Sequence, residues 1–155
     1  MSRVIEILKY EDQQLAYYME QRQTVEEWVL KALIWLERNA SAQGYKDLVS
    51  PSELVEYVLD EFYMVKVGNT LVAFSVAEPW FMRGQVICEE FIVPLTDDPA
   101  PLADVVKALE AAGRSCGCKV ATFGTRANPK HKGLAKLLED TGARISTIEL
   151  IKEIP

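Results

Sequence analysis

The stretch Val86–Pro94, with the sequence VICEEFIVP, decides how the rest of this chain is read. Its apolar and β-branched residues predict a buried strand, followed by a helix at 102–116 and a second strand at 119–125. Strand, helix and strand in this order predict adjacent parallel strands joined by a right-handed crossover. Glu89 and Glu90 lie inside the first strand, where charge is normally excluded, so this strand also indicates chemistry.

Length and composition set the outer limits. The chain has 155 residues, enough for one domain with a proper core and too few for two, so we expect a single domain over 1–155. The net charge of −6 argues against binding nucleic acid or an anionic membrane by bulk electrostatics. No apolar run has the length of a membrane span, and the first residues do not resemble a signal peptide, so we expect no membrane association.

The cysteines indicate a reducing compartment. Cys88, Cys116 and Cys118 are an odd number, and Cys88 lies in the apolar strand, so we predict three free thiols and a cytoplasmic location. Cys116 and Cys118 could form half of a metal site, but there is no second pair and His131 is the only histidine. We therefore expect no metal.

Turn residues, helix-capping residues and the spacing of apolar residues predict the other strands and helices. Strands are expected at 4–8, 62–67, 70–77 and 144–154, and helical residues at 11–42 with a break near 21–23, from 51 onward, and from 129 to 142. Thr24 with Glu27 predicts a capping box, Ser50 and Pro51 open the next helix, and Asn128 opens the last. The order predicts an α+β fold, with a mixed central sheet flanked by helices on both faces.

Two groups of aromatic residues have alternative readings. The helix that contains Trp28 and Trp35 is apolar over most of its circumference, so it is either largely buried or binds something. Trp80 and Phe81 lie in a connection between Pro79 and Gly84, where exposed aromatic residues would mark a binding surface and buried ones would anchor the loop.

The order of elements resembles the GNAT superfamily of acyl-CoA N-acyltransferases over nearly the whole chain. Residues 88–94 are similar to the fourth strand of that family, and 117–122 to its fifth strand with the preceding Gly. Asn128 and the leucine-rich segment 134–143 are similar to its last helix. The pattern most resembles divergent acetyltransferase-like proteins of bacteriophages. The resemblance implies a GNAT-like fold that uses acetyl-CoA as co-substrate, with the acyl thioester held along Phe91, Ile92 and Val93.

The segment that should bind the cofactor pyrophosphate departs from the family. The GNAT loop offers successive backbone N–H groups at a helix start. Here the matching residues are Asp97, Asp98, Pro99, Ala100 and Pro101. Prolines lack the N–H donor and aspartates bring negative charge, so we expect the usual cradle to be missing. The same residues suit the start of a helix, with Asp98 as its N-cap and Pro99 in its first turn.

The residues expected to supply a general acid also depart from the family. Many members place a Tyr on the last helix to protonate the departing thiolate, and the matching position here is Leu138. The aromatic residue that ends the family motif is replaced by Ala143. Any catalysis would need another acid, water, or a thiolate that leaves unaided.

Glu89 and Glu90 are the candidate catalytic bases. A carboxylate in a partly dry setting can have its pKa raised toward neutrality and deprotonate an ammonium. Neighbours on a strand point to opposite faces, so we expect only one to face a given cleft. The alternative is that one is exposed at a sheet margin and the other pairs with a Lys or Arg.

A basic cluster gathers at the start of the last helix. It comprises Arg126, Lys130, His131, Lys132 and Lys136, and with Asn128 at the helix start it is the best anion site in the sequence. It could take the phosphates of CoA or a nucleic-acid backbone. The alternative is a solvated basic face on an acidic protein.

Together these readings predict a divergent acyl-CoA-dependent N-acetyltransferase that acts on a primary amine of a small molecule or protein. The expected cofactor contacts are Phe91, Ile92, Val93, Arg126, Asn128, Lys130 and Lys132. The alternatives are a catalytically inactive GNAT-fold binding or inhibitor protein, a virion-associated protein, and a protein acting on nucleic acid, which the negative charge disfavours. A phage-encoded protein would work in the host cytoplasm, and a homodimer is left open.

Overall fold

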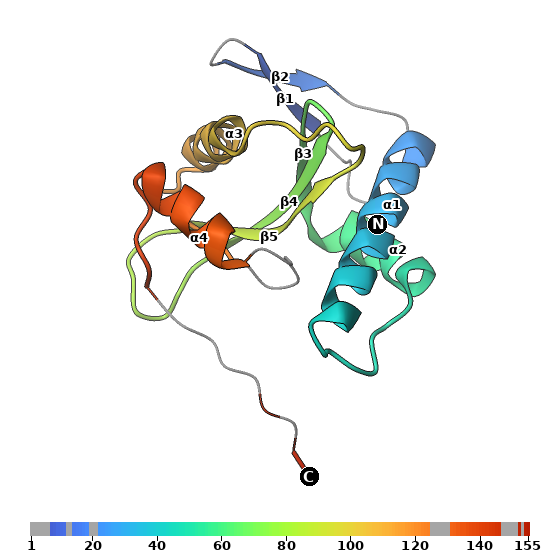
Figure 1. Cartoon of the computed structure of the whole chain (residues 1–155). Coiled ribbons are helices and arrows are strands. Elements are labelled where there is room, and N and C mark those ends of the chain that lie inside the picture. The colour runs from blue at the N-terminus through green and yellow to red at the C-terminus, as the bar shows by residue number, and fades with distance from the viewer. Residues whose placement is uncertain (1–6, 12–13, 19–21, 125–130, 147–151, 153) are drawn as a thin grey trace.

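The computed structural model describes residues 7–11, 14–18, 22–124, 131–146, 152 and 154–155. Within these residues the fold is α+β, built on a six-stranded mixed sheet with the strand order β2-β1-β3-β4-β5-β6 (Figure 1). The strands are β1 Ile7–Glu11, β2 Gln14–Tyr18, β3 Tyr63–Val67, β4 Thr70–Ala77, β5 Val86–Pro94 and β6 Val120–Thr122. The predicted α+β class with a mixed central sheet is confirmed.

The pairing of β5 with β6 is parallel, as the sequence predicts. Val86 lies opposite Val120 and Cys88 opposite Thr122, and α3 (Leu102–Ser115) connects the two strands. β5 pairs antiparallel with β4 on its other side, and β4 pairs antiparallel with β3. β1 lies parallel to β3 and antiparallel to β2. The predicted pair of adjacent parallel strands connected by a helix is therefore confirmed.

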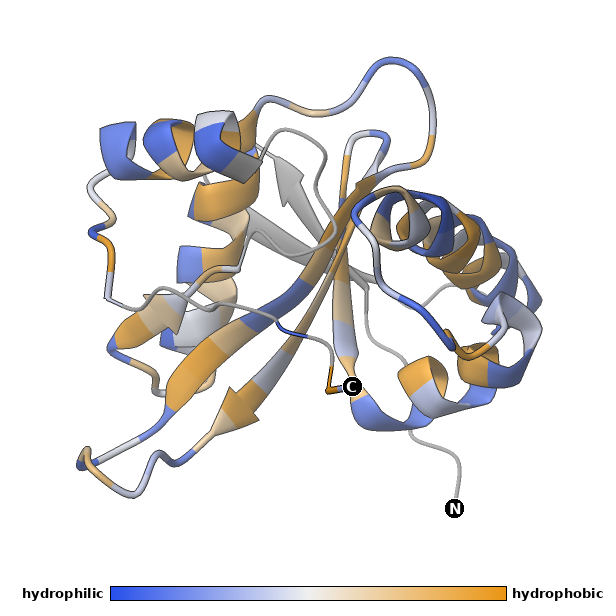
Figure 2. Ribbon diagram, turned by 60° about the horizontal axis from the view of Figure 1, so that its bottom comes forward, coloured by the Kyte–Doolittle hydropathy of each residue, from blue (hydrophilic) through white to orange (hydrophobic). Residues whose placement is uncertain are grey.

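Helices cover both faces of the sheet. α1 (Arg22–Ala42) and α2 (Pro51–Glu61) pack on one face through a cluster that includes Val29, Leu59 and Phe91. α3 packs on the opposite face through a second cluster that includes Ile87 and Leu109. In Figure 2 the central strands form a hydrophobic band, and a hydrophilic stretch interrupts β5 midway. α4 (His131–Asp140) follows β6 in the chain.

Local signals place several boundaries correctly. Pro51 is the first residue of α2, with Ser50 as its N-cap, although the cap is made by the backbone carbonyl of Ser50 and not by its hydroxyl. Gly68 has φ +54° in the turn between β3 and β4, a backbone conformation that glycine adopts without a Cβ clash. The predicted start of α2 is therefore confirmed.

The prediction of helical residues from 11 onward is wrong for its first part. Gln14–Tyr18 is β2, which pairs along its length with β1. Pairing with a neighbouring strand outweighs the local pattern, because sheet formation depends on partners that a sequence window does not contain. α1 begins at Arg22, so Thr24 lies inside the helix and the predicted capping box is wrong.

Two further predictions differ from the structure near the C-terminal end. The strand expected at 119–125 is the shorter β6, and residue 125 lies outside the described residues. Of the strand expected at 144–154, residues 144–146, 152 and 154 are not in a strand, and the others lie outside the described residues. Within the described residues, β6 is therefore an edge strand of the sheet.

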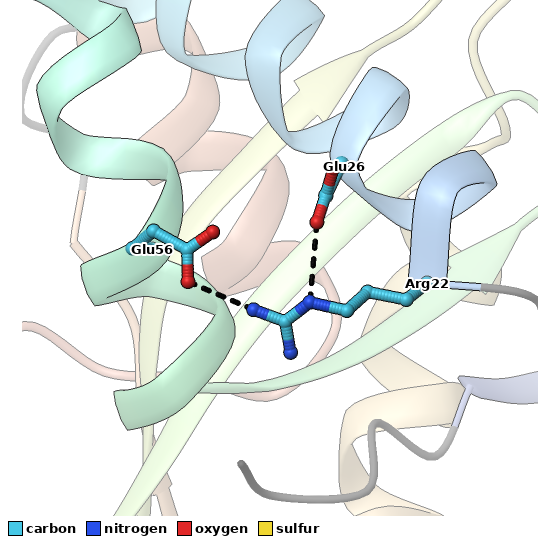
Figure 3. Close-up of polar contacts among 3 residues, drawn as sticks. All are labelled: Arg22, Glu26 and Glu56. Carbon is cyan, nitrogen blue, oxygen red and sulfur yellow. Dashed lines mark hydrogen bonds and ion pairs between the residues drawn. The ribbon is translucent and has the colours of Figure 1, made fainter.

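Arg22 links the first turn of α1 to α2. Its guanidinium donates to Glu26 at 3.1 Å and to Glu56 at 2.8 Å (Figure 3). All three side chains are substantially exposed. Exposed pairs of this kind contribute little to stability, so the packing of α1 on α2 depends mainly on the apolar cluster beneath them.

Candidate active site at the open edge of β5

β5 loses its second neighbour after the first three of its nine residues. Its pairing with β6 ends at Cys88 and Thr122, whereas its pairing with β4 continues to Pro94. Among the described residues, no strand pairs with the β6 side of Glu89–Pro94. We call this side the open edge of β5. Backbone groups on an unpaired strand edge need a hydrogen-bond partner from water or a ligand.

A β-bulge lies at the same place. Phe74 of β4 is opposite Glu89, whereas the preceding Ala73 is opposite Phe91, which leaves Glu90 as an extra residue in β5. Bulges bend a strand and change the direction of its side chains, and they are common beside active sites. The two carboxylates therefore lie where the ladder is irregular and where the open edge begins.

Glu89 is the partly buried member of the pair. Its Oε2 accepts a hydrogen bond of 3.0 Å from the backbone N–H of Gly124, which follows β6. Burial raises the pKa of Glu89 from 4.5 to about 7, against the opposing effect of the Gly124 hydrogen bond and with a smaller contribution from the charge of Glu90. Glu89 therefore titrates near neutrality, where a general base works best.

Glu90 is exposed and has a different anchor. Its Oε1 accepts a hydrogen bond of 2.7 Å from the hydroxyl of Ser75 on β4. Neither Glu89 nor Glu90 forms an ion pair with a Lys or Arg among the described residues. Within that part of the chain, the alternative that an ion pair explains one of these carboxylates finds no support.

Both carboxylate residues line one cavity of about 200 Å³. The expectation that only one could face a given cleft is therefore wrong. Phe91 and Ile92 also line this cavity, although they pack in the clusters on opposite faces of the sheet. The cavity thus follows the open edge of β5 rather than one face, and residues of both orientations reach it. We call it the edge cavity.

Helices complete the walls of the edge cavity. Trp35 and Leu36 come from α1, Leu134 comes from α4, and Gly124 lies beyond β6. Of the three residues expected to hold an acyl thioester, Phe91 and Ile92 line the cavity. Val93 is fully buried in the cluster beneath α1 and α2, so only its backbone could contact a ligand.

The segment after β5 has most of its donors engaged. The N–H of Ala100 donates to Thr70 Oγ1 at 2.9 Å, and the N–H of Asp98 donates to Thr96 Oγ1 at 3.2 Å. Pro99 and Pro101 have no N–H. The N-cap of α3 is Pro101, so the prediction that Asp98 caps this helix is wrong. The hydrogen bonds to Thr70 and Thr96 explain the conformation without any ligand.

The predicted anion site is described only in part. Lys132 and Lys136 are exposed on α4. His131 is the first residue of that helix, and its side chain lies outside the described part, as do Arg126, Asn128 and Lys130. Leu138, at the position where many GNAT members have Tyr, is buried and only 5 % exposed. It supplies core packing instead of a proton.

The aromatic groups separate clearly. Trp28 and Trp35 are half-buried against the cluster beneath α1, and the ammonium of Lys66 lies 5.0 Å from the centre of the Trp28 ring. Trp80 and Phe81 are 94 % and 69 % exposed and touch each other edge to face. Trp28 and Trp35 therefore pack against the core, whereas Trp80 and Phe81 are exposed on the surface.

A larger cavity of about 360 Å³ lies on the other side of β6, lined by residues of α3, β6 and the turn after α4. Neither catalytic candidate lines it. Among the described residues there is no group of three or more side chains able to hold a metal ion, and no helix that is long and apolar enough to cross a membrane. The three cysteines are free thiols, in agreement with the prediction.

Sequence reasoning missed the two groups that anchor the carboxylates. Gly124 is 35 residues from Glu89, and Ser75 is 15 residues from Glu90. Ser75 lies on β4, which pairs with β5, and Gly124 follows β6, which pairs with the start of β5. No known family model and no curated protein sequence matches this chain. The function must therefore be argued from the geometry of the edge cavity.

Proposed function

We propose that this protein is a divergent acyl-CoA-dependent N-acyltransferase with a GNAT-like fold, which acetylates a primary amine. The observation that carries the proposal is Glu89, a partly buried carboxylate with a pKa of about 7 in a cavity where β5 and β6 separate. Neutral amines attack thioesters, whereas ammonium ions do not, so the reaction needs a base that works near neutral pH.

The chemistry follows from this position. Glu89 takes a proton from the substrate ammonium, directly or through one water. The amine nitrogen then attacks the thioester carbonyl carbon, forming the C–N bond of the amide. The nitrogen loses its second proton to water, and the C–S bond breaks to release the CoA thiolate. Because Leu138 replaces the usual Tyr and is buried, the thiolate leaves unaided or takes its proton from water.

The open edge of β5 offers a place for the acyl arm. Strands expose N–H and C=O groups along an unpaired edge, and a pantetheine amide can pair with them as a neighbouring strand would. Phe91, Ile92 and Val93 supply this edge beside Glu89. In this proposal the acetyl group lies next to Glu89 and the rest of the cofactor extends toward the end of β5.

The phosphates of CoA need a separate site. The donors at Asp98 and Ala100 are engaged within the protein, and Asp97 and Asp98 carry the wrong charge. In this proposal the phosphates bind at α4, through Lys132 together with Arg126, Asn128 and Lys130. The basic residues there would offset the repulsion from the acidic protein as a whole.

Calorimetric titration with acetyl-CoA tests the proposal. We expect Lys132→Glu to weaken binding by about tenfold, the scale of one lost charge-assisted contact. Lys107→Glu on α3, which reverses another exposed lysine, should leave binding unchanged, as should Asp97→Asn. Failure of the wild-type protein to bind acetyl-CoA at millimolar concentration would contradict the proposal.

The second candidate is a catalytically inactive GNAT-fold protein that binds or inhibits a partner, or a virion-associated protein. Two observations favour it. The N–H groups of Asp98 and Ala100 are hydrogen-bonded within the protein, and Trp80 and Phe81 are exposed. This reading predicts no acetyl transfer to any amine and no acetyl-CoA binding, together with normal folding of the protein.

A further inference from the structure

The walls of the edge cavity have an uneven chemical character. Among the described residues, those that line it are Trp35, Leu36, Glu89, Glu90, Phe91, Ile92, Gly124 and Leu134. Five are large apolar residues, two are carboxylates, and among these described residues there is no cation. A ligand that complements this lining carries one positive charge and is otherwise apolar, because unpaired charge against apolar walls is costly.

Each of the two carboxylates has one oxygen anchored by a donor from another part of the chain. Gly124 donates to Oε2 of Glu89, and Ser75 donates to Oε1 of Glu90. Among the described residues, no group donates to Oε1 of Glu89 or to Oε2 of Glu90. An ammonium has three N–H donors and can therefore bond to both free oxygens while it points its remaining substituent elsewhere.

The volume limits the size of that substituent. Sites for drug-sized ligands span roughly 300–1,000 Å³, and the edge cavity has about 200 Å³. Trp35 and Leu36 on α1 and Leu134 on α4 form its apolar side. A polyamine would place its second and third charges against these side chains, so it is disfavoured.

We infer that the acceptor is a small primary monoamine whose nitrogen is carried on an apolar body, aromatic or branched. The ammonium lies between Glu89 and Glu90, and the apolar body lies against Trp35, Leu36 and Leu134. This inference rests on the proposed acyltransferase function, since that function brings an amine to Glu89 beside the acetyl group.

Acetyl transfer to a panel of amines tests the inference. With acetyl-CoA as donor, kcat/KM for 2-phenylethylamine should exceed that for n-propylamine by at least about tenfold, because each added apolar group in a matching pocket contributes discrimination of that order. Spermidine and a lysine-containing peptide should be poorer substrates than 2-phenylethylamine. A higher kcat/KM for spermidine or for the peptide would overturn the inference and leave the acyltransferase function standing.

A matched pair of variants on α4 locates the apolar contact. Leu134 lines the cavity, whereas Leu137 is on the same helix, is 54 % exposed and does not line it. We expect Leu134→Ala to lower kcat/KM for 2-phenylethylamine by about tenfold and to change n-propylamine much less, while Leu137→Ala changes neither. Equal effects of the two variants, or equal losses for both amines, would overturn the assignment.

Titration of 2-phenylethylamine without acetyl-CoA separates the two proposals. If the edge cavity is an amine site, binding should be saturable, and Glu90→Gln should weaken it whereas Glu110→Gln should not. If the same protein transfers no acetyl group, this result would support the amine site and refute the acyltransferase function. Glu110 is an exposed carboxylate on α3 outside the edge cavity, so it serves as the charge control. Absence of saturable amine binding would overturn the inference.

Discussion

The two halves of β5 have the same kind of sequence but different surroundings. Val86, Ile87 and Cys88 have a strand on each side, and the first two are almost fully buried. Glu89 to Pro94 have β4 on one side and the open edge on the other. Both halves contribute apolar residues to the core, yet only the second half begins with two carboxylates.

The different surroundings of the two halves explain where this sheet tolerates a charged side chain. A carboxylate at Val86 or Ile87 would be buried between two hydrogen-bonded strands, and its desolvation would be uncompensated. At the start of the second half, Gly124 and Ser75 each supply a donor, and the edge cavity gives access to ligand or water. The first half is held by a strand on each side, and the second half carries the residues of the proposed chemistry.

The largest expected effect comes from removing the base in the second half. Glu89→Gln keeps the size of the side chain and can still accept from Gly124, but it cannot take a proton. We expect acetyl transfer to fall by about 10²–10⁴-fold, the usual contribution of a general base. Steady-state kinetics at pH 8 measures it, with Glu110→Gln as the control. Retention of more than a tenth of the wild-type rate would remove Glu89 from the mechanism.

The same truncation in each half tests the structural side of the comparison. Ile87 is 2 % exposed in the doubly paired half, whereas Ile92 is only half-buried at the open edge. We expect Ile87→Ala to lower the free energy of unfolding by about 2–5 kcal/mol and Ile92→Ala to lower it less. Urea denaturation measures both. Equal losses would show that the open edge is as tightly packed as the paired half.

The raised pKa of Glu89 predicts how stability changes with pH. The carboxyl binds its proton more tightly in the folded state, with a pKa of about 7 against 4.5, so its contribution to stability is fully present below pH 4.5 and is lost as pH rises through 7. The loss is on the order of 3 kcal/mol.

Comparison with Glu89→Gln isolates this contribution, because the amide does not titrate. Urea denaturation from pH 4.5 to 8 should show the variant gaining stability relative to the wild-type protein, with most of the gain between pH 4.5 and 7. The rate of acetyl transfer should rise over the upper part of the same range, as the base ionises. A stability difference that does not vary with pH would contradict the assignment of the raised pKa to Glu89.

The smallest expected effect lies far from β5 and gives a baseline for the other measurements. Arg22→Ala removes the exposed pairs with Glu26 and Glu56. We expect a loss of at most about 1 kcal/mol in the free energy of unfolding, which should shrink further in 0.5 M salt. A loss as large as that of Ile87→Ala would mean that the contact between α1 and α2 depends on charge rather than on apolar packing.

Sequence alone predicted the parts of the fold that have local causes. Pro51 at the start of α2 is one example, because the fixed φ of a single proline suits the first turn of a helix. β2 was missed because its pairing with β1 is not visible in a local sequence window. The cap at Asp98 was misplaced because Thr70 and Thr96 engage the loop donors and α3 starts later, at Leu102.

The candidate site was predictable in its residue types but not in its geometry. Two carboxylates inside an apolar strand were visible in the sequence. That both line one cavity depends on the end of the β5–β6 pairing, and their anchors come from residues 15 and 35 positions away. Contacts over such separations are set by the tertiary fold, which a pattern along one strand does not encode.

The extra residue at Glu90 has a consequence for comparing this chain with any other. A regular strand has a period of two, so residues five apart belong to opposite faces. Ile87 and Ile92 are five apart, yet both pack on the α3 side, because the bulge reverses the parity of the strand between them. Any alignment to a strand without a bulge must open a gap at Glu90. Without that gap, every apolar residue in one half would be matched to the wrong side of the sheet.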